Sequence, residues 1–237
     1  MKGKGFSIVR KRLSGLLLLC TSFMLSGCFL SIRFGDETAP NSAVYKVTFS
    51  SQWNASSFPT NYPFNSELEP IFTVNHNASL SLFSLGSTAT TGIRQFAETG
   101  NTNALRTEVR RYQNQNLAGN ITELSPVGRE VSFFLRVTQS QPSVTILASL
   151  FPSPDWFAAV SGQRLFQDEK WLDSATIQLA VFDAGTDSGE TFTSPNAPEI
   201  PARGVSLLST NRSDSDFRVG KHYANGNAVA TVTFSLQ

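Results

Sequence analysis

The chain has 237 residues, of which 40% are hydrophobic and 16% charged, so it can bury a substantial core and is not of the type that stays disordered. Its formal charge of +1 depends on five basic residues within the first twelve positions, and without them 14 basic residues face 18 acidic ones, a net charge of −4. A mildly acidic domain without Lys/Arg clusters excludes nucleic acid as an expected partner.

The N-terminus has the pattern of a secretory leader. Met1–Arg12 is basic, and Leu13–Leu25 is an apolar run of 13 residues, too short to span a bilayer comfortably. The run ends in Leu-Ser-Gly-Cys, which resembles the bacterial lipobox, in which the cysteine is lipidated after cleavage. We therefore predict a lipoprotein signal peptide at 1–27 and lipidation of Cys28. The alternative is an ordinary signal peptide with Cys28 as a chance free thiol.

Lipidation would decide both the redox chemistry and the location of the mature protein. Cys20 would leave with the signal peptide and Cys28 would carry acyl chains such as palmitate, so the mature domain is expected to have no disulfide. Several acyl chains on one residue anchor a protein stably to a membrane. The next residue is Phe29 and not Asp, which by analogy with Gram-negative sorting predicts the outer membrane of the cell envelope. Residues 28–42 show no periodic pattern of apolar residues, and we interpret them as a tether between the membrane and the domain.

The first element of the domain is a strand at Val44–Ser50, where apolar and polar residues alternate. A segment rich in aromatic residues and proline follows, from Trp53 to Phe64. Because its prolines exclude a central strand, we expect a packed loop that covers a sheet edge or a barrel end. An aromatic platform for a ligand is the alternative.

Residues 91–112 change to a helical spacing of apolar side chains. Two short helices are predicted, the first ending near Glu98-Thr99-Gly100 and the second running from about Asn103 to Gln113.

Strands return after the helices. Glu130–Thr138 and Ser143–Leu150 are predicted to form a hairpin with a four-residue turn, and Ala175–Phe182 and Ala228–Leu236 are predicted as further strands. Strands dominate, with one helical insert. The fold class is therefore mainly β, an antiparallel β-sandwich whose loops gather at its two ends.

Acidic residues follow two of these strands directly. Asp155 comes after the second strand of the predicted hairpin, in a turn set by prolines. Asp183 ends the strand 175–182, and Asp187 follows it in a loop with glycines and hydroxyl side chains. Oxygen-rich loops at strand ends suit a hard cation, so the three carboxylates are candidate Ca²⁺ ligands. Asp and Gly also occupy ordinary turns, which is the alternative.

Two stretches, Pro-Ser-Pro-Asp-Trp-Phe at 152–157 and Asp-Ala-Gly-Thr-Asp-Ser-Gly at 183–189, resemble the spondin domain, the module named after F-spondin and mindin. The resemblance covers about residues 43–237. It implies a C2-like sandwich of about eight strands, with a calcium ion held by Asp155, Asp183 and Asp187. Phe83 stands where the family usually has tryptophan, and Arg136 where some relatives offer a glutamate.

The resemblance also implies a non-enzymatic module for adhesion or recognition, with a glycan or an extracellular protein as its partner. One alternative is a carboxylate- or metal-dependent hydrolase of the cell envelope. Another is a purely structural envelope protein, in which calcium only stabilises the fold. Against an enzyme, the sequence has no Gly-x-Ser-x-Gly or His-Glu-x-x-His motif, and its only histidines are His76 and His222. We expect His76 to make structural hydrogen bonds and His222 to be solvated.

Overall fold

The computed structural model describes residues 38–59, 62–125, 128–208, 217 and 228–237. Thr38–Gln237 forms one compact unit. The predicted signal peptide, Cys28 and His222 lie outside the described residues. Within the described part of the chain, no helix is both long and apolar enough to cross a membrane.

The first sheet has four antiparallel strands in the order β4-β1-β12-β9. Its members are β1 (Ser42–Ser51), β4 (Glu130–Thr138), β9 (Ser174–Gln178) and β12 (Ala230–Leu236). The predicted strands at 44–50, 130–138 and 228–236 are confirmed here, with shifts of one or two residues at some ends. In each of these strands apolar and polar residues alternate, because one face of the sheet is buried and the other faces solvent.

The second sheet has six strands in the order β11-β10-β6-β5-β2-β3, and all their pairings are antiparallel. Its members are β2 (Glu67–His76), β3 (Ala118–Leu124), β5 (Ser143–Phe151), β6 (Trp156–Arg164), β10 (Ala180–Asp183) and β11 (Ser206–Leu207). A separate two-stranded ribbon pairs β7 (Phe166–Gln167) with β8 (Lys170–Trp171). The expected mainly-β, antiparallel sandwich is confirmed.

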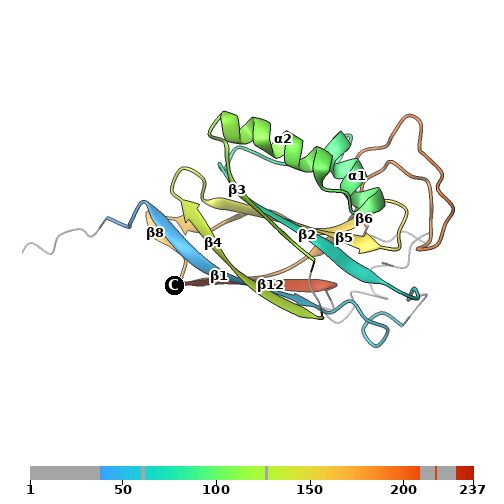
Figure 1. Ribbon diagram of the computed structural model, residues 1–237, viewed down its shortest axis with the longest axis horizontal. Coiled ribbons are helices and arrows are strands. Elements are labelled where there is room, and N and C mark those ends of the chain that lie inside the picture. The colour runs from blue at the N-terminus through green and yellow to red at the C-terminus, as the bar shows by residue number, and fades with distance from the viewer. Residues whose placement is uncertain (1–37, 60–61, 126–127, 209–216, 218–227) are drawn as a thin grey trace, which may run out of the picture. The chain divides into compact units, whose positions relative to one another are not determined.

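The two helices are α1 (Thr91–Thr99) and α2 (Asn103–Asn114), which confirms the predicted insert. The Thr90 side chain caps α1 by accepting a hydrogen bond from the Ile93 N–H, and Gly100 ends it in a left-handed conformation. The helices cover the outer face of the six-stranded sheet (Figure 1).

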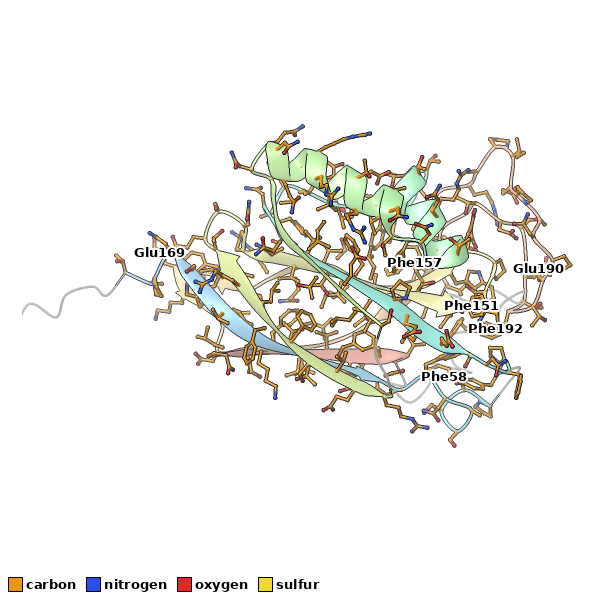
Figure 2. The ribbon with its side chains drawn as sticks, in the orientation of Figure 1. Phe58, Phe151, Phe157, Glu169, Glu190 and Phe192 are labelled. Carbon is orange, nitrogen blue, oxygen red and sulfur yellow. The ribbon has the colours of Figure 1, made fainter. Side chains whose placement is uncertain are left out.

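Two hydrophobic cores hold these layers together. Between the sheets, Tyr45 and Val47 of β1 pack in one buried cluster with Ile146 of β5. Between the six-stranded sheet and the helices, Phe96 of α1 packs in a second cluster with Phe157 of β6, which is labelled in Figure 2. The middle strands of the six-stranded sheet are therefore buried on both faces, and eight of the nine residues of β5 are buried.

The predicted hairpin between β4 and β5 is wrong, although both strands exist. β4 pairs with β1 in the first sheet, and β5 pairs with β2 and β6 in the second. Only one isolated bridge, between Thr138 and Gln141, joins the two ends of the connection. The reason is the burial of the strands: β4 has one solvated face, whereas β5 is buried on both, so they belong in different layers.

The predicted strand Ala175–Phe182 is also divided between the two sheets. Its first half is β9 of the four-stranded sheet and its second half is β10 of the six-stranded sheet. At the junction the Leu179 N–H donates to the Ala230 carbonyl at 2.9 Å, and the Leu208 N–H donates to the Val181 carbonyl at 2.8 Å. Apolar and polar residues continue to alternate from β9 into β10, because both strands turn apolar residues toward the core between the sheets.

The expected structural role of His76 is confirmed. Its ring is buried, with Nε2 2.8 Å from the Thr145 hydroxyl and Nδ1 2.8 Å from the Asn77 carbonyl. The Thr145 hydroxyl also accepts a hydrogen bond from the Gly162 N–H at 3.0 Å. One hydroxyl therefore connects β2, β5 and β6, and burial lowers the pKa of His76.

Replacing Thr145 with valine is expected to destabilise the domain by about 1 to 3 kcal/mol, because the buried Nε2 of His76 loses its partner. Thr73 gives a matched control, since it is equally buried and its hydroxyl has no hydrogen-bond partner among the described residues. Thr73→Val should be neutral or stabilising. Urea unfolding of both variants measures the difference, and equal effects would contradict the assigned hydrogen bonds.

Candidate metal site

Asp155 lies in the tight turn between β5 and β6. The Ser153 hydroxyl donates to the Leu150 carbonyl and accepts a hydrogen bond from the Trp156 N–H at 3.1 Å. This side chain closes the turn, while the flanking prolines restrict its backbone. As a result the Asp155 side chain is held in a fully buried position.

Asp183 reaches the same place from the neighbouring strand. It is the last residue of β10 and pairs in register with Trp156 of β6. The Ala184 N–H donates to the Asp155 carbonyl at 3.0 Å, which joins the two strand ends. Asp183 is buried too, and its charge acts on the Asp155 carboxyl. The structure thus brings together two of the three predicted ligands.

The loop after β10 contains two Asp-x-Gly turns of the same kind. The Gly185 N–H donates to Asp183 Oδ1 and the Gly189 N–H donates to Asp187 Oδ1, each at 2.7 Å. The second oxygen of Asp187 accepts a hydrogen bond from the Ala197 N–H at 2.9 Å. The Asp187 side chain therefore also ties this loop to the segment that returns toward β11.

The two oxygens of Asp155 have different surroundings. Oδ2 accepts hydrogen bonds from the Thr186 N–H at 2.6 Å, the Asp187 N–H at 3.0 Å and the Thr186 hydroxyl at 3.2 Å. Oδ1 is buried and has no hydrogen-bond partner among the described residues. A buried carboxylate oxygen without a partner is costly, so the Asp155 side chain is suited to an additional ligand.

The electrostatics of Asp155 support this interpretation. Burial, and after it the charge of Asp183, raises the pKa of the Asp155 carboxyl from 3.8 to about 7, although the hydrogen bonds from Thr186 and Asp187 act in the opposite direction. The charged form is therefore disfavoured in the protein alone. A bound cation would favour it.

The side chains fit a hard cation in part. Among the described residues, no group of three or more His, Cys, Asp or Glu side chains is arranged so that it could hold a metal ion. The side-chain donors of Asp155 and Asp183 are oxygens, however, which calcium prefers, and Asp155 Oδ1 is buried without a hydrogen-bond partner among the described residues. These two residues could hold an ion together with backbone carbonyls and water. The three-carboxylate ligand set with Asp187 stays a prediction.

Comparison with known proteins agrees with the family resemblance seen in the sequence and with the observed fold. A sequence profile of the Spondin_N family matches residues 43–230, which is most of the chain. The chain belongs to the Spondin_N family. The match extends from β1 to the first residue of β12 and includes the loops that carry all three aspartates.

Named relatives share the Spondin_N domain at moderate identity. The chain is 29% identical to Spondin-2 of Homo sapiens over 175 residues, which are 71% of this chain and 53% of Spondin-2. It is 29% identical to Spondin-1 of Rattus norvegicus and 30% identical to Spondin-1 of Xenopus laevis, in each case over 184 residues, 74% of this chain and 23% of the relative. The chain thus matches about half the length of Spondin-2 and about a quarter of Spondin-1.

A cleft of about 360 Å³ lies beside residues 183–189, the aspartate loop of the Spondin_N domain. Thr186, which donates to Asp155, is also part of its wall, so the loop that surrounds the candidate ion site reaches a surface hollow. The remaining wall comes from α1 and from the segment before β11: Arg94, Glu98, Asn196, Pro198, Glu199, Ile200 and Ala202.

Sequence reasoning missed two features of this site. It counted the hydroxyl side chains of the loop among the oxygens available to a cation, whereas the Thr186 hydroxyl donates to Asp155. It also missed the segment at Arg203 and Gly204, whose carbonyls lie against Gly185. The sequence signal for the Arg203–Gly204 segment was Gly185, because a glycine between two acidic residues in a turn indicates that another backbone segment approaches closely.

Proposed function

We propose that this Spondin_N domain is a non-enzymatic recognition module whose aspartate loop is ordered by calcium. The observation that carries the proposal is the buried Asp155 carboxylate, with one oxygen lacking a partner among the described residues, beside the second buried carboxylate of Asp183. Membership of the Spondin_N family supports the recognition role, because resemblance to spondin domains implies a module for adhesion or recognition. The partner is a glycan or an extracellular protein.

In this proposal the ion supplies positive charge that keeps the buried Asp155 carboxylate ionised beside Asp183. Asp155 holds the Thr186 and Asp187 backbone N–H groups through its other oxygen, so its position and the shape of the loop are coupled. Because Thr186 also forms part of the wall of the neighbouring cleft, the position of Asp155 affects the shape of that wall. The recognition surface would then be rigid only when the ion is bound.

The alternative, a carboxylate- or metal-dependent hydrolase, has less support. Asp155 has the raised pKa of a general acid. A general acid must reach the substrate, however, and Asp155, Asp183 and Asp187 are each at most 2% exposed. Buried carboxylates bonded to backbone N–H groups hold a loop in shape more readily than they reach a glycosidic bond.

We also propose that the mature chain is attached to the cell envelope, in the outer membrane, through acyl chains on Cys28. The lipobox-like sequence supports this proposal, and it makes the domain a surface-held module that would present its loops to a partner.

The function is tested with cells that produce the wild-type full chain, Asp155→Asn or Cys28→Ser, applied to arrays of glycans and extracellular proteins with calcium or with a chelator. Wild-type cells should bind specific spots in calcium only. Asp155→Asn cells should retain the protein at the envelope but lose this binding, and Cys28→Ser should release the protein from the membrane fraction. Binding unchanged by chelator, or turnover of a chromogenic glycoside library, would overturn the proposal.

A further inference from the structure

The outer edge of β4 has no partner strand among the described residues, and at its last residue the Thr138 carbonyl accepts a hydrogen bond from the Gln141 N–H at 3.0 Å. β4 ends the order of the four-stranded sheet and pairs with β1 over nine successive residues without a bulge. Hydrogen bonds at the two ends of this ladder, from the Ser51 N–H to the Arg129 carbonyl at 2.7 Å and from the Gln139 N–H to the Asn41 carbonyl at 3.0 Å, assign the odd-numbered residues to the β1 side. The even-numbered residues therefore point their N–H and C=O groups away from the sheet.

This edge lacks most of the features that usually prevent strands from pairing with other molecules. Natural edge strands carry charged side chains, especially lysine, or proline or a bulge, or are very short. β4 has nine residues without proline, lysine or a bulge, and its two charged side chains, Glu130 and Arg136, have opposite signs. It presents Phe134, whose side chain is 68% exposed, on one face and the half-buried Val131 and Phe133 on the other. By comparison, β3, β9 and β11, the other strands that end the two sheets, have seven, five and two residues.

The sequence of β4 is complementary to itself when it runs antiparallel to a second copy. With Phe133 opposite Phe133 of the second copy, Glu130 stands opposite Arg136 on one side of the twofold axis and Arg136 opposite Glu130 on the other. Both charged side chains are exposed on the same face of the sheet, where they contact Ser50 and Ser42 of β1. Ser132 and Phe134 face each other between these pairs.

We propose that this protein forms a twofold dimer by antiparallel pairing of β4 with β4 of a second copy, which joins two four-stranded sheets into one. The even-numbered residues form the hydrogen-bonded pairs in this register, as their free N–H and C=O groups require. Phe133 falls in a non-hydrogen-bonded pair on the axis, where aromatic side chains pack closely. The interface is isologous, so every charge pair occurs twice.

The proposal is tested by charge reversal on the full chain, with the dimer dissociation constant measured by sedimentation equilibrium in density-matched detergent. Glu130→Arg and Arg136→Glu should each weaken the dimer by about tenfold or more, because each places two pairs of like charges in contact. The double variant E130R/R136E should return the constant to near the wild-type value, since both pairs are restored in reversed order.

A second pair of variants tests the hydrogen-bonded edge. Ser132→Pro removes an N–H that points away from β1, so it should abolish the dimer while leaving the pairing with β1 in place, and Ser132→Ala, which keeps the N–H, should dimerise normally. Circular dichroism checks that both variants are folded. A wild-type chain that stays monomeric at high concentration would overturn the proposal, as would a dimer insensitive to both single charge reversals. The test does not depend on an ion at Asp155.

Discussion

Asp155→Asn is expected to abolish most of the stabilisation of this domain by calcium. At a calcium concentration one hundredfold above its dissociation constant, the wild-type protein should gain about 2.7 kcal/mol of unfolding free energy. The variant should gain little, because a neutral amide replaces the buried carboxylate whose Oδ1 has no other partner among the described residues. Thermal or urea unfolding in calcium and in chelator measures both gains.

The same substitution is expected to flatten the pH dependence of stability in the absence of calcium. Burial and the charge of Asp183 raise the pKa of Asp155 to about 7 in the folded protein, against an ordinary value of 3.8. Between these values the folded state binds more protons than the unfolded state, so the unfolding free energy of the wild type falls as pH rises through this window. The loss contributed by Asp155 is on the order of 4 kcal/mol. In chelator at pH 8, Asp155→Asn should therefore be the more stable protein.

The difference between the two proteins at each pH is the quantity to compare. The pKa of the buried His76 is lowered, so its contribution to stability changes in the opposite sense, decreasing as pH falls below about 6.5. That contribution is common to both proteins and cancels in the difference. Asp168→Asn serves as a control, because Asp168 is exposed and its positive φ of 48° is one that asparagine tolerates. A full calcium gain in Asp155→Asn would rule out Asp155 as a ligand.

Strands with one solvated face could be found from sequence, whereas strands buried on both faces were harder to recognise. β1, β4 and β12 alternate and were predicted correctly. β2 and β6 were missed, because burial on both faces replaces alternation with mixed runs, and β2 is also interrupted by a register shift between Leu68 and Ile71. Helix α1 was predictable because its Gly100 stop is local in sequence.

Pairing between strands was the least predictable feature. Four residues between β4 and β5 suggested a hairpin, yet this connection passes from one sheet to the other. Whether a short connection reverses a strand or changes layer depends on which core buries the next strand, and that is a property of distant residues. The division of 175–182 into β9 and β10 has the same cause.

The candidate site was predictable to the extent that strand ends determine it. Asp155 directly precedes β6 and Asp183 ends β10, which pairs with β6, so the Asp183 charge acts on the Asp155 carboxyl. The conformation of Asp187 depends on Ala197, ten residues further along an irregular segment, and no local pattern specifies that hydrogen bond. Its role as a calcium ligand stays a prediction for the same reason.

Gly185→Ala is expected to be among the most damaging single substitutions in the aspartate loop. Gly185 has a φ of +73°, and a Cβ there would lie 2.6 Å from the Arg203 carbonyl oxygen and 3.0 Å from that of Gly204. Both are backbone atoms, and the Arg203 N–H donates to the Gly185 carbonyl at 2.7 Å, so neither segment can move without losing this bond. We expect a loss of about 3 kcal/mol or more of unfolding free energy.

Gly86→Ala separates the backbone strain of this substitution from the steric clash. Gly86 has a similar φ of +80°, but a Cβ there would meet no atom within 4 Å. It should therefore cost only about 1 to 2 kcal/mol, the price of a left-handed conformation in a residue with a Cβ. Urea unfolding gives both values, and calcium titration should show that Gly185→Ala also weakens ion binding, because Gly185 donates to Asp183 Oδ1. Equal losses in the two variants would mean that the contact with Arg203 does not constrain the loop, and that Gly185 is needed only for its φ.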